Sequence, residues 1–118
     1  MSELLKILEN FCQMEGVKGA LVVNGEKKVI ESFLDPVINA EELAGIISTS
    51  NAVGQELSQV LEKQALSRGY IEFEEESITI EMLSKGIILA VLSSPEANLG
   101  RIRLEIRKNR KALENLVA

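Results

Sequence analysis

The chain has 118 residues, of which 46% are hydrophobic and 26% charged, and a net charge of −5; this composition is typical of one globular domain over residues 1–118. No stretch reaches the roughly 20 apolar residues of a membrane-spanning helix, and the amphipathic N-terminus is not signal-like, so we expect a cytoplasmic protein without a membrane span. The chain has no histidine and a single cysteine, which excludes an internal disulfide and removes the commonest general base and metal ligand. We therefore expect no catalytic residues, no metal, no cofactor and no enzymatic activity.

The first predicted element is a helix over about residues 2–14, in which apolar residues recur at helical spacing. Cys12 lies on its apolar stripe, which favours a small core residue over a reactive thiol. Two predicted strands, over residues 19–23 and 28–34, follow this helix. They flank Asn24-Gly25, which is a strong signal for a tight hairpin.

A long helix is predicted next, from Asn39 to the residue before Gly69. Asn39 is a preferred N-cap and Glu42, three residues on, completes a capping box, while Gly69 is the expected C-terminal stop. About 28 residues would make a helix about 42 Å long, whereas a domain of this size has a radius of gyration of about 13–14 Å. One domain can hardly cover such a helix, so we expect either a partner against it or a kink at Gly45 or Gly54.

The apolar pattern of this helix favours the partner. Ile46, Val53 and Val60 repeat every seven residues, and neighbouring apolar residues make the stripe wide enough to face both a sheet and a second helix. Small residues along the helix would let backbones approach closely: Ala44, Gly45, Ser48, Ala52 and Gly54. The alternative is a single amphipathic core helix with a tolerant middle.

Three strands follow the long helix. Residues 70–74 and 78–82 alternate apolar and polar side chains, whereas residues 87–92 form an unbroken apolar run typical of a buried strand. The glutamates of residues 74–76 resemble a cation site but lack the glycine and the alternating oxygen ligands of a calcium loop, so a solvated turn is the better interpretation. Because short turns join these strands, they must be antiparallel neighbours, which makes the fold class α+β, with an antiparallel sheet covered by helices.

A last helix is predicted from Pro95 to Leu116, with Ser94 as its N-cap. Gly100 either allows close contact with a neighbouring element or is a merely tolerated glycine. From Leu99 onward six basic residues face two acidic ones, a net charge of +4 that leaves −9 for the rest of the chain. A basic helix could bind nucleic acid, but no aromatic residues interleave with these basic residues to stack bases. We interpret the basic residues as a solvated helix face, partly paired with the acidic body, and expect no nucleic-acid partner.

The most distinctive segment is the last strand and its passage into the last helix. Its apolar run, a Ser-Pro junction and then Ala97-Asn98-Leu99-Gly100 with Arg103 resemble the roadblock / dynein light-chain family, which includes the MglB-type regulators of bacteria and archaea. The resemblance extends over essentially the whole chain, through Phe11–Val17, Gly19–Gly25 and Gly54-Gln55 with Leu57. It implies a five-stranded antiparallel sheet with the long helix on one face and the two terminal helices on the other.

The resemblance also implies a homodimer, formed by pairing the third strands and packing the long helices together. On this sequence the dimer interface would contain Ile46, Ser50, Val53, Leu57, Val60, Tyr70, Glu72 and Glu74. Family members bind small Ras-like GTPases, and the bacterial type stimulates GTP hydrolysis without donating catalytic chemistry. The implied function is a non-catalytic GTPase regulator. Its candidate partner-binding residues are Asn51, Gln55 and Arg68, and Arg68 is also the nearest candidate for an arginine finger.

Two other classes of function stay open. A structural adaptor, comparable to a dynein light chain, would bind partner subunits without any effect on nucleotide hydrolysis. A small-ligand sensor is the third class, although aromatic and polar pocket candidates are scarce in the sequence. No motif names the partner, the pathway or the direction of regulation.

Overall fold

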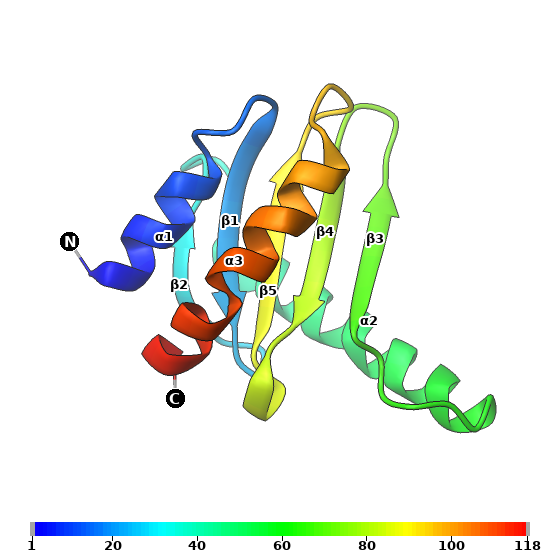
Figure 1. Cartoon of the computed structure of the whole chain (residues 1–118). Helices are drawn as coiled ribbons and strands as arrows, with labels where there is room; N and C mark the ends of the chain where they lie inside the picture. Colours follow the sequence, from blue (N-terminus) through cyan, green and yellow to red (C-terminus); the bar gives the residue numbers. More distant parts are fainter. Residues whose placement is uncertain (1, 118) are drawn as a thin grey trace.

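The computed structural model describes residues 2–117 and consists of one sheet between helices (Figure 1). Its elements, in chain order, are α1 (Glu3–Phe11), β1 (Val17–Val23), β2 (Val29–Phe33), α2 (Ala40–Val60), β3 (Arg68–Glu72), β4 (Ser77–Met82), a 3-10 turn (Ser84–Gly86), β5 (Ile88–Ser93) and α3 (Leu99–Val117). The five strands are antiparallel and lie in the order β2-β1-β5-β4-β3, so β5 is central. The predicted α+β class and five-stranded sheet are confirmed.

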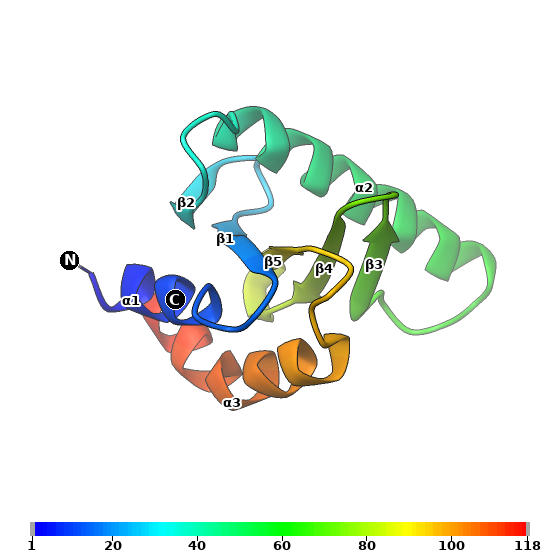
Figure 2. The same cartoon turned by 90° about the horizontal axis from the view of Figure 1, so that it is seen from above.

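The sheet separates two hydrophobic layers. Figure 2 shows α2 on one face of the sheet and both α1 and α3 on the other, as predicted. All six residues of β5 are buried, because Leu89 and Val91 pack beneath α1 and α3 while Ile88 and Ala90 pack beneath α2. A strand that is covered on both faces needs apolar residues throughout, which explains why the run in β5 shows no alternation.

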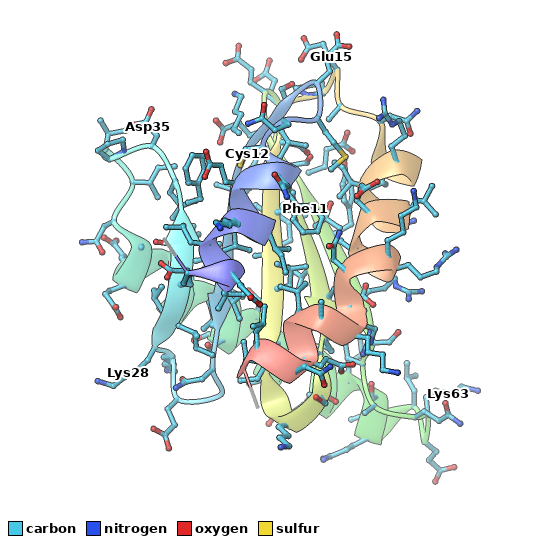
Figure 3. The ribbon with its side chains drawn as sticks, turned by 60° about the vertical axis from the view of Figure 1, so that its left-hand side comes forward. Phe11, Cys12, Glu15, Lys28, Asp35 and Lys63 are labelled. Carbon is cyan, nitrogen blue, oxygen red and sulfur yellow. The ribbon has the colours of Figure 1, made fainter. Side chains whose placement is uncertain are left out.

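The first helix ends at Phe11, earlier than predicted. Figure 3 shows Phe11 and Cys12 together at the C-terminal end of α1. Phe11 is buried, and Cys12 is half-buried against the same cluster of side chains. Burial, with a smaller effect of the Glu9 carboxylate, raises the pKa of the Cys12 thiol. The thiol is therefore protonated near neutral pH and packs as a small core residue.

The loop between β1 and β2 is wider than the predicted tight turn. The Asn24 side-chain oxygen accepts hydrogen bonds from the backbone N–H groups of Glu26 at 2.8 Å and Lys28 at 3.1 Å. Lys27, rather than Gly25, has a positive φ of 66°. Asn24 thus stabilises the loop through hydrogen bonds of its side chain. The Asn-Gly dipeptide alone does not distinguish this kind of loop from a tight two-residue turn.

The long helix is shorter than predicted, since α2 contains 21 residues and is about 32 Å long. It ends in a Schellman motif, in which Glu62 has a positive φ of 56°. The Glu62 N–H bonds to the Gln59 carbonyl at 3.1 Å, and the Lys63 N–H bonds to the Ser58 carbonyl at 2.9 Å. Gly69, the predicted stop, instead lies in β3. Because the radius of gyration is 13.5 Å, helix length alone no longer requires a partner.

The reason for this early end is a loop, residues 62–67, that folds back onto the helix. Leu66 packs directly over Gly54, where an added Cβ would lie 2.5 Å from Leu66 Cδ2. Gly54 thus allows a close approach as predicted, but to its own chain. The same expectation is wrong for Gly100, whose added Cβ would meet only Asn98 Oδ1, at 3.3 Å.

The last helix begins at Leu99, later than predicted. Its N-cap is Asn98, whose Oδ1 accepts a hydrogen bond from the Arg101 N–H at 3.1 Å. Ser94, the predicted cap, instead donates its backbone N–H to the Gly16 carbonyl at 2.8 Å. Ser94 therefore belongs to a turn that connects β5 to α3.

Replacing Asn98 with alanine should lower the free energy of unfolding by about 1 kcal/mol, because the first turn of α3 loses its side-chain acceptor. The matched variant Ser94→Ala should change it by less than about 0.5 kcal/mol. Urea unfolding followed by circular dichroism measures both values. A larger loss for Ser94→Ala than for Asn98→Ala would contradict the observed start of α3.

Candidate functional site

An exposed apolar seam runs along α2. Ile46, Val53, Leu57 and Val60 are 58%, 61%, 57% and 78% exposed, and Ser50 lies between the first two. These five residues, which we call the α2 seam, are spaced by four, three, four and three residues, the a/d spacing of a coiled coil. Full burial of a valine or leucine side chain contributes about 1.5–3 kcal/mol. The α2 seam therefore favours contact with another apolar surface.

The α2 seam is distinct from the face that packs on the sheet. The buried residues of α2 are Ala44, Ile47 and Ser48, all in its N-terminal half, and this half packs on β1 and β2. From Asn51 to Val60 no residue is buried. Figures 1 and 2 show this half of α2 and the following loop, with Lys63 labelled at its tip in Figure 3, extending past β3. The C-terminal half of α2 thus has an apolar flank that residues 2–117 leave uncovered.

The edge strand β3 lies beside this uncovered half of the helix. Within the described chain β3 pairs with β4 and with no other strand, so its outer edge has free backbone donors and acceptors. Tyr70 and Glu72, two predicted interface residues, are exposed on β3. The predicted strand over residues 70–74 is wrong at its end, because β3 ends at Glu72 and Glu74 lies in a turn closed by the hydrogen bond from the Phe73 N–H to the Glu76 carbonyl. The other predicted interface residues lie on the α2 seam or β3, and the role of all of them at an interface stays a prediction.

The three predicted partner-binding residues are already engaged within the chain. The Gln55 side chain donates to Asn51 Oδ1 at 3.4 Å and accepts from the Leu66 N–H at 3.1 Å. Gln55 therefore holds the loop that follows α2. Arg68 Nε donates to Glu81 Oε1 at 3.2 Å, and this hydrogen bond raises the pKa of the guanidinium. A strand arginine bonded to a carboxylate differs from the free loop arginine of an arginine finger.

Glu81 is a buried carboxylate that the sequence pattern did not predict. The alternation in β4 suggests an outward, solvated side chain, but α3 covers this face and the Glu81 side chain is only 7% exposed. Its Oε2 accepts a hydrogen bond from Arg110 Nη1 at 2.7 Å, and Arg110 also donates to the Met82 carbonyl at 2.7 Å. Together with Arg68, these bonds link β3, β4 and α3. The predicted pairing of the basic helix with the acidic body is confirmed at this point.

Residues 2–117 contain no group of three or more histidine, cysteine, aspartate or glutamate side chains positioned to hold a metal ion. In the same residues, no helix is both long enough and apolar enough to cross a membrane. The exposed apolar side chains of the α2 seam and the unpaired edge of β3 make this border of the molecule the candidate functional site.

Comparisons with known proteins agree with this architecture. The sequence pattern of the Roadblock/LC7 domain matches residues 3–93. An uncharacterized protein of Methanocaldococcus jannaschii is 28% identical over 103 residues, which cover 87% of this chain and 86% of that protein. The structure of Myxococcus xanthus MglB has a TM-score of 0.90 at 17% identity and covers 99% of this chain and 96% of its own. A Roadblock/LC7 domain from Streptomyces avermitilis has a TM-score of 0.90 at 18% identity and covers 98% of both chains. Because the family pattern spans most of its length and its fold is that of these solved structures, the chain belongs to the Roadblock/LC7 domain family.

Proposed function

We propose that two copies of this chain associate through the α2 seam and the free edge of β3, and that this dimer binds a small Ras-like GTPase and modulates its GTP hydrolysis. In this proposal residues 1–118 act as one cytoplasmic domain that contributes no catalytic group. The observation that carries it is the apolar a/d seam beside an unpaired sheet edge. Both features are costly to leave in water and both can be covered by one contact.

A twofold contact suits these two features. In a symmetric dimer the same patch meets itself, so it must be self-complementary. The α2 seam is apolar except at the small side chain of Ser50, which lets it pack against a copy of itself. Figure 2 shows the outer half of α2 and β3 at the same border of the molecule, so one contact can include both.

The charges of β3 support a specific register. The strand has Arg68 at one end and Glu72 at the other, each two residues from Tyr70. Antiparallel pairing of two copies centred on Tyr70 places Arg68 of each copy opposite Glu72 of the other. Opposite charges in directly facing positions stabilise a strand pair, whereas like charges destabilise it.

The second half of the proposal is supported by family membership and by the fold shared with MglB. The resemblance to MglB-type regulators associates this fold with stimulated GTP hydrolysis. Arg68 is bonded to Glu81, and the other arginines lie on α3, across the sheet from α2. The proposal therefore assigns no arginine finger to the α2 surface. Stimulation would act by holding the catalytic residues of the GTPase in position.

Val53→Asp should abolish the dimer, because burying an unpaired carboxylate in an apolar contact is unfavourable. Light scattering should then give the mass of one 13.0 kDa chain, against twice that mass for the natural sequence. Val37→Asp is the matched control, since Val37 is 87% exposed and lies outside the α2 seam. An unchanged dimer mass for Val53→Asp would contradict the proposed interface.

Glu72→Lys should weaken the dimer by roughly threefold or more, because a lysine would face Arg68 of the other copy. Glu74→Lys makes the same charge change in the neighbouring turn and should leave the dissociation constant nearly unchanged. Dilution in analytical ultracentrifugation measures both constants. Equal effects of the two variants would rule out the register centred on Tyr70 while leaving the α2 contact intact.

The proposed regulation is tested by GTP turnover of a Ras-like GTPase from the same genome, measured with and without this protein. We expect the rate to change when the dimer is added and to return to its basal value with Val53→Asp. Binding without any change in rate would instead identify an adaptor. Absence of binding to each Ras-like GTPase of that genome would overturn both functions.

A further inference from the structure

A second surface feature lies on the face of the sheet opposite to α2. A cavity of about 170 Å³ opens between α3 and the strands β3 and β4, and it is lined by Arg68, Glu81, Arg103, Ile106, Arg107 and Arg110. We call it the arginine cleft. Figure 1 shows α3 running obliquely across the sheet from β4 toward β1, with β3 to one side of the helix. The cleft therefore has one helical wall and a floor made by the sheet.

The helical wall concentrates positive charge. Arg103, Arg107 and Arg110 are separated by four and three residues, so they lie on the same flank of α3. Ile106 is buried between them and attaches this part of α3 to the sheet. Like charges at these spacings destabilise a helix by a few tenths of a kcal/mol per pair. The three arginines therefore repel one another in the isolated helix, and a bound anion would reduce this repulsion.

The charges of the cleft are not balanced within the chain. Glu81 accepts hydrogen bonds from Arg68 and Arg110, and Glu114 lies 3.7 Å from Arg110 Nε. Among residues 2–117, Arg103 and Arg107 have no carboxylate oxygen within 4.0 Å. The four arginines of the cleft exceed Glu81, in its lining, and Glu114, beside Arg110, by two positive charges, in a protein whose net charge is −5.

We propose that the arginine cleft binds the phosphate groups of a small polyphosphate-bearing anion, chiefly through the guanidinium groups of Arg103 and Arg107. The planar donor fork of arginine matches pairs of phosphate oxygens, and hydrogen bonds between charged groups are the strong ones. The small volume admits a compact anionic group rather than a helix or strand. No aromatic side chain lines the cavity to stack on a base, so the phosphate chain itself is the recognised part, whether free or carried by a nucleotide.

The natural protein, labelled with nitrogen-15, is titrated with inorganic pyrophosphate and tripolyphosphate at low salt and followed by NMR. We expect saturable binding, with the largest shifts at residues that line the arginine cleft, and weaker binding at high salt. The double variant Arg103→Gln/Arg107→Gln should weaken binding by roughly tenfold or more, since it removes charged donors that are worth at least about 1.5 kcal/mol.

The matched control is Arg101→Gln/Lys111→Gln, which removes the same charge from exposed positions of α3 outside the cleft. It should change the dissociation constant by less than about twofold. Equal losses of affinity for the two double variants would show that binding depends only on net charge and would overturn the proposal. Chemical shifts centred elsewhere in the natural protein would place the anion at another site and would also overturn it. The shift map of the natural protein gives this answer even if a variant fails to fold.

The source of the phosphate is tested by adding GTP and ATP. Affinities equal to that of tripolyphosphate would support recognition of the phosphate chain alone. A nucleotide that binds tenfold more tightly would overturn it by showing that a base contributes. Tighter, cleft-dependent binding of a polyglutamate peptide or of single-stranded RNA would likewise overturn it, in favour of a macromolecular ligand. The arginine cleft and the α2 seam lie on opposite faces of the sheet. Absence of phosphate binding at the cleft would therefore leave the proposed GTPase regulation intact.

Discussion

The arrangement of this molecule depends on the burial of β5 on both of its faces. A central strand without a polar face needs an apolar layer above it and another below it. α1 and α3 together supply one layer, and the N-terminal half of α2 supplies much of the other. Once this half of α2 has covered β1 and β2, the rest of the helix passes beyond the sheet. The uncovered α2 seam is thus a direct consequence of how the core is closed.

The two faces of the sheet present different kinds of binding surface. On the α2 side the surface is apolar and continuous with a free strand edge, which favours extended contact with another protein. On the α3 side the surface is a small cavity with charged walls, which favours a compact anion. Apolar contact is non-directional and grows with area, whereas guanidinium recognition depends on geometry. The two surfaces therefore favour different kinds of ligand.

β3 is the element that the two surfaces share. Its outer edge borders the uncovered half of α2, and Arg68 reaches from it into the arginine cleft. The bond from Arg68 to the buried Glu81, with the bond from Arg110 to the same carboxylate, holds this edge strand, its neighbour β4 and α3 in a defined relation. Removing the buried Glu81 carboxylate would take the shared partner from both arginines, so the group has a structural role.

The sequence by itself determined the order of the elements, the burial of β5 and the α2 seam, because apolar periodicity is a local property that the chain carries into any compact state. The faces covered by each helix were expected only from the resemblance to the roadblock family. The sequence did not determine where α2 ends. Residues 62–67 contain neither glycine nor proline, and only the packing of Leu66 on Gly54 shows why they leave the helix. The burial of Glu81 and the arginine cleft were likewise decided by tertiary structure, since each brings together residues from α3, β3 and β4. The sequence shows which residues are charged and where they stand in the chain, but which charged groups pair is decided only when the sheet and the helices pack.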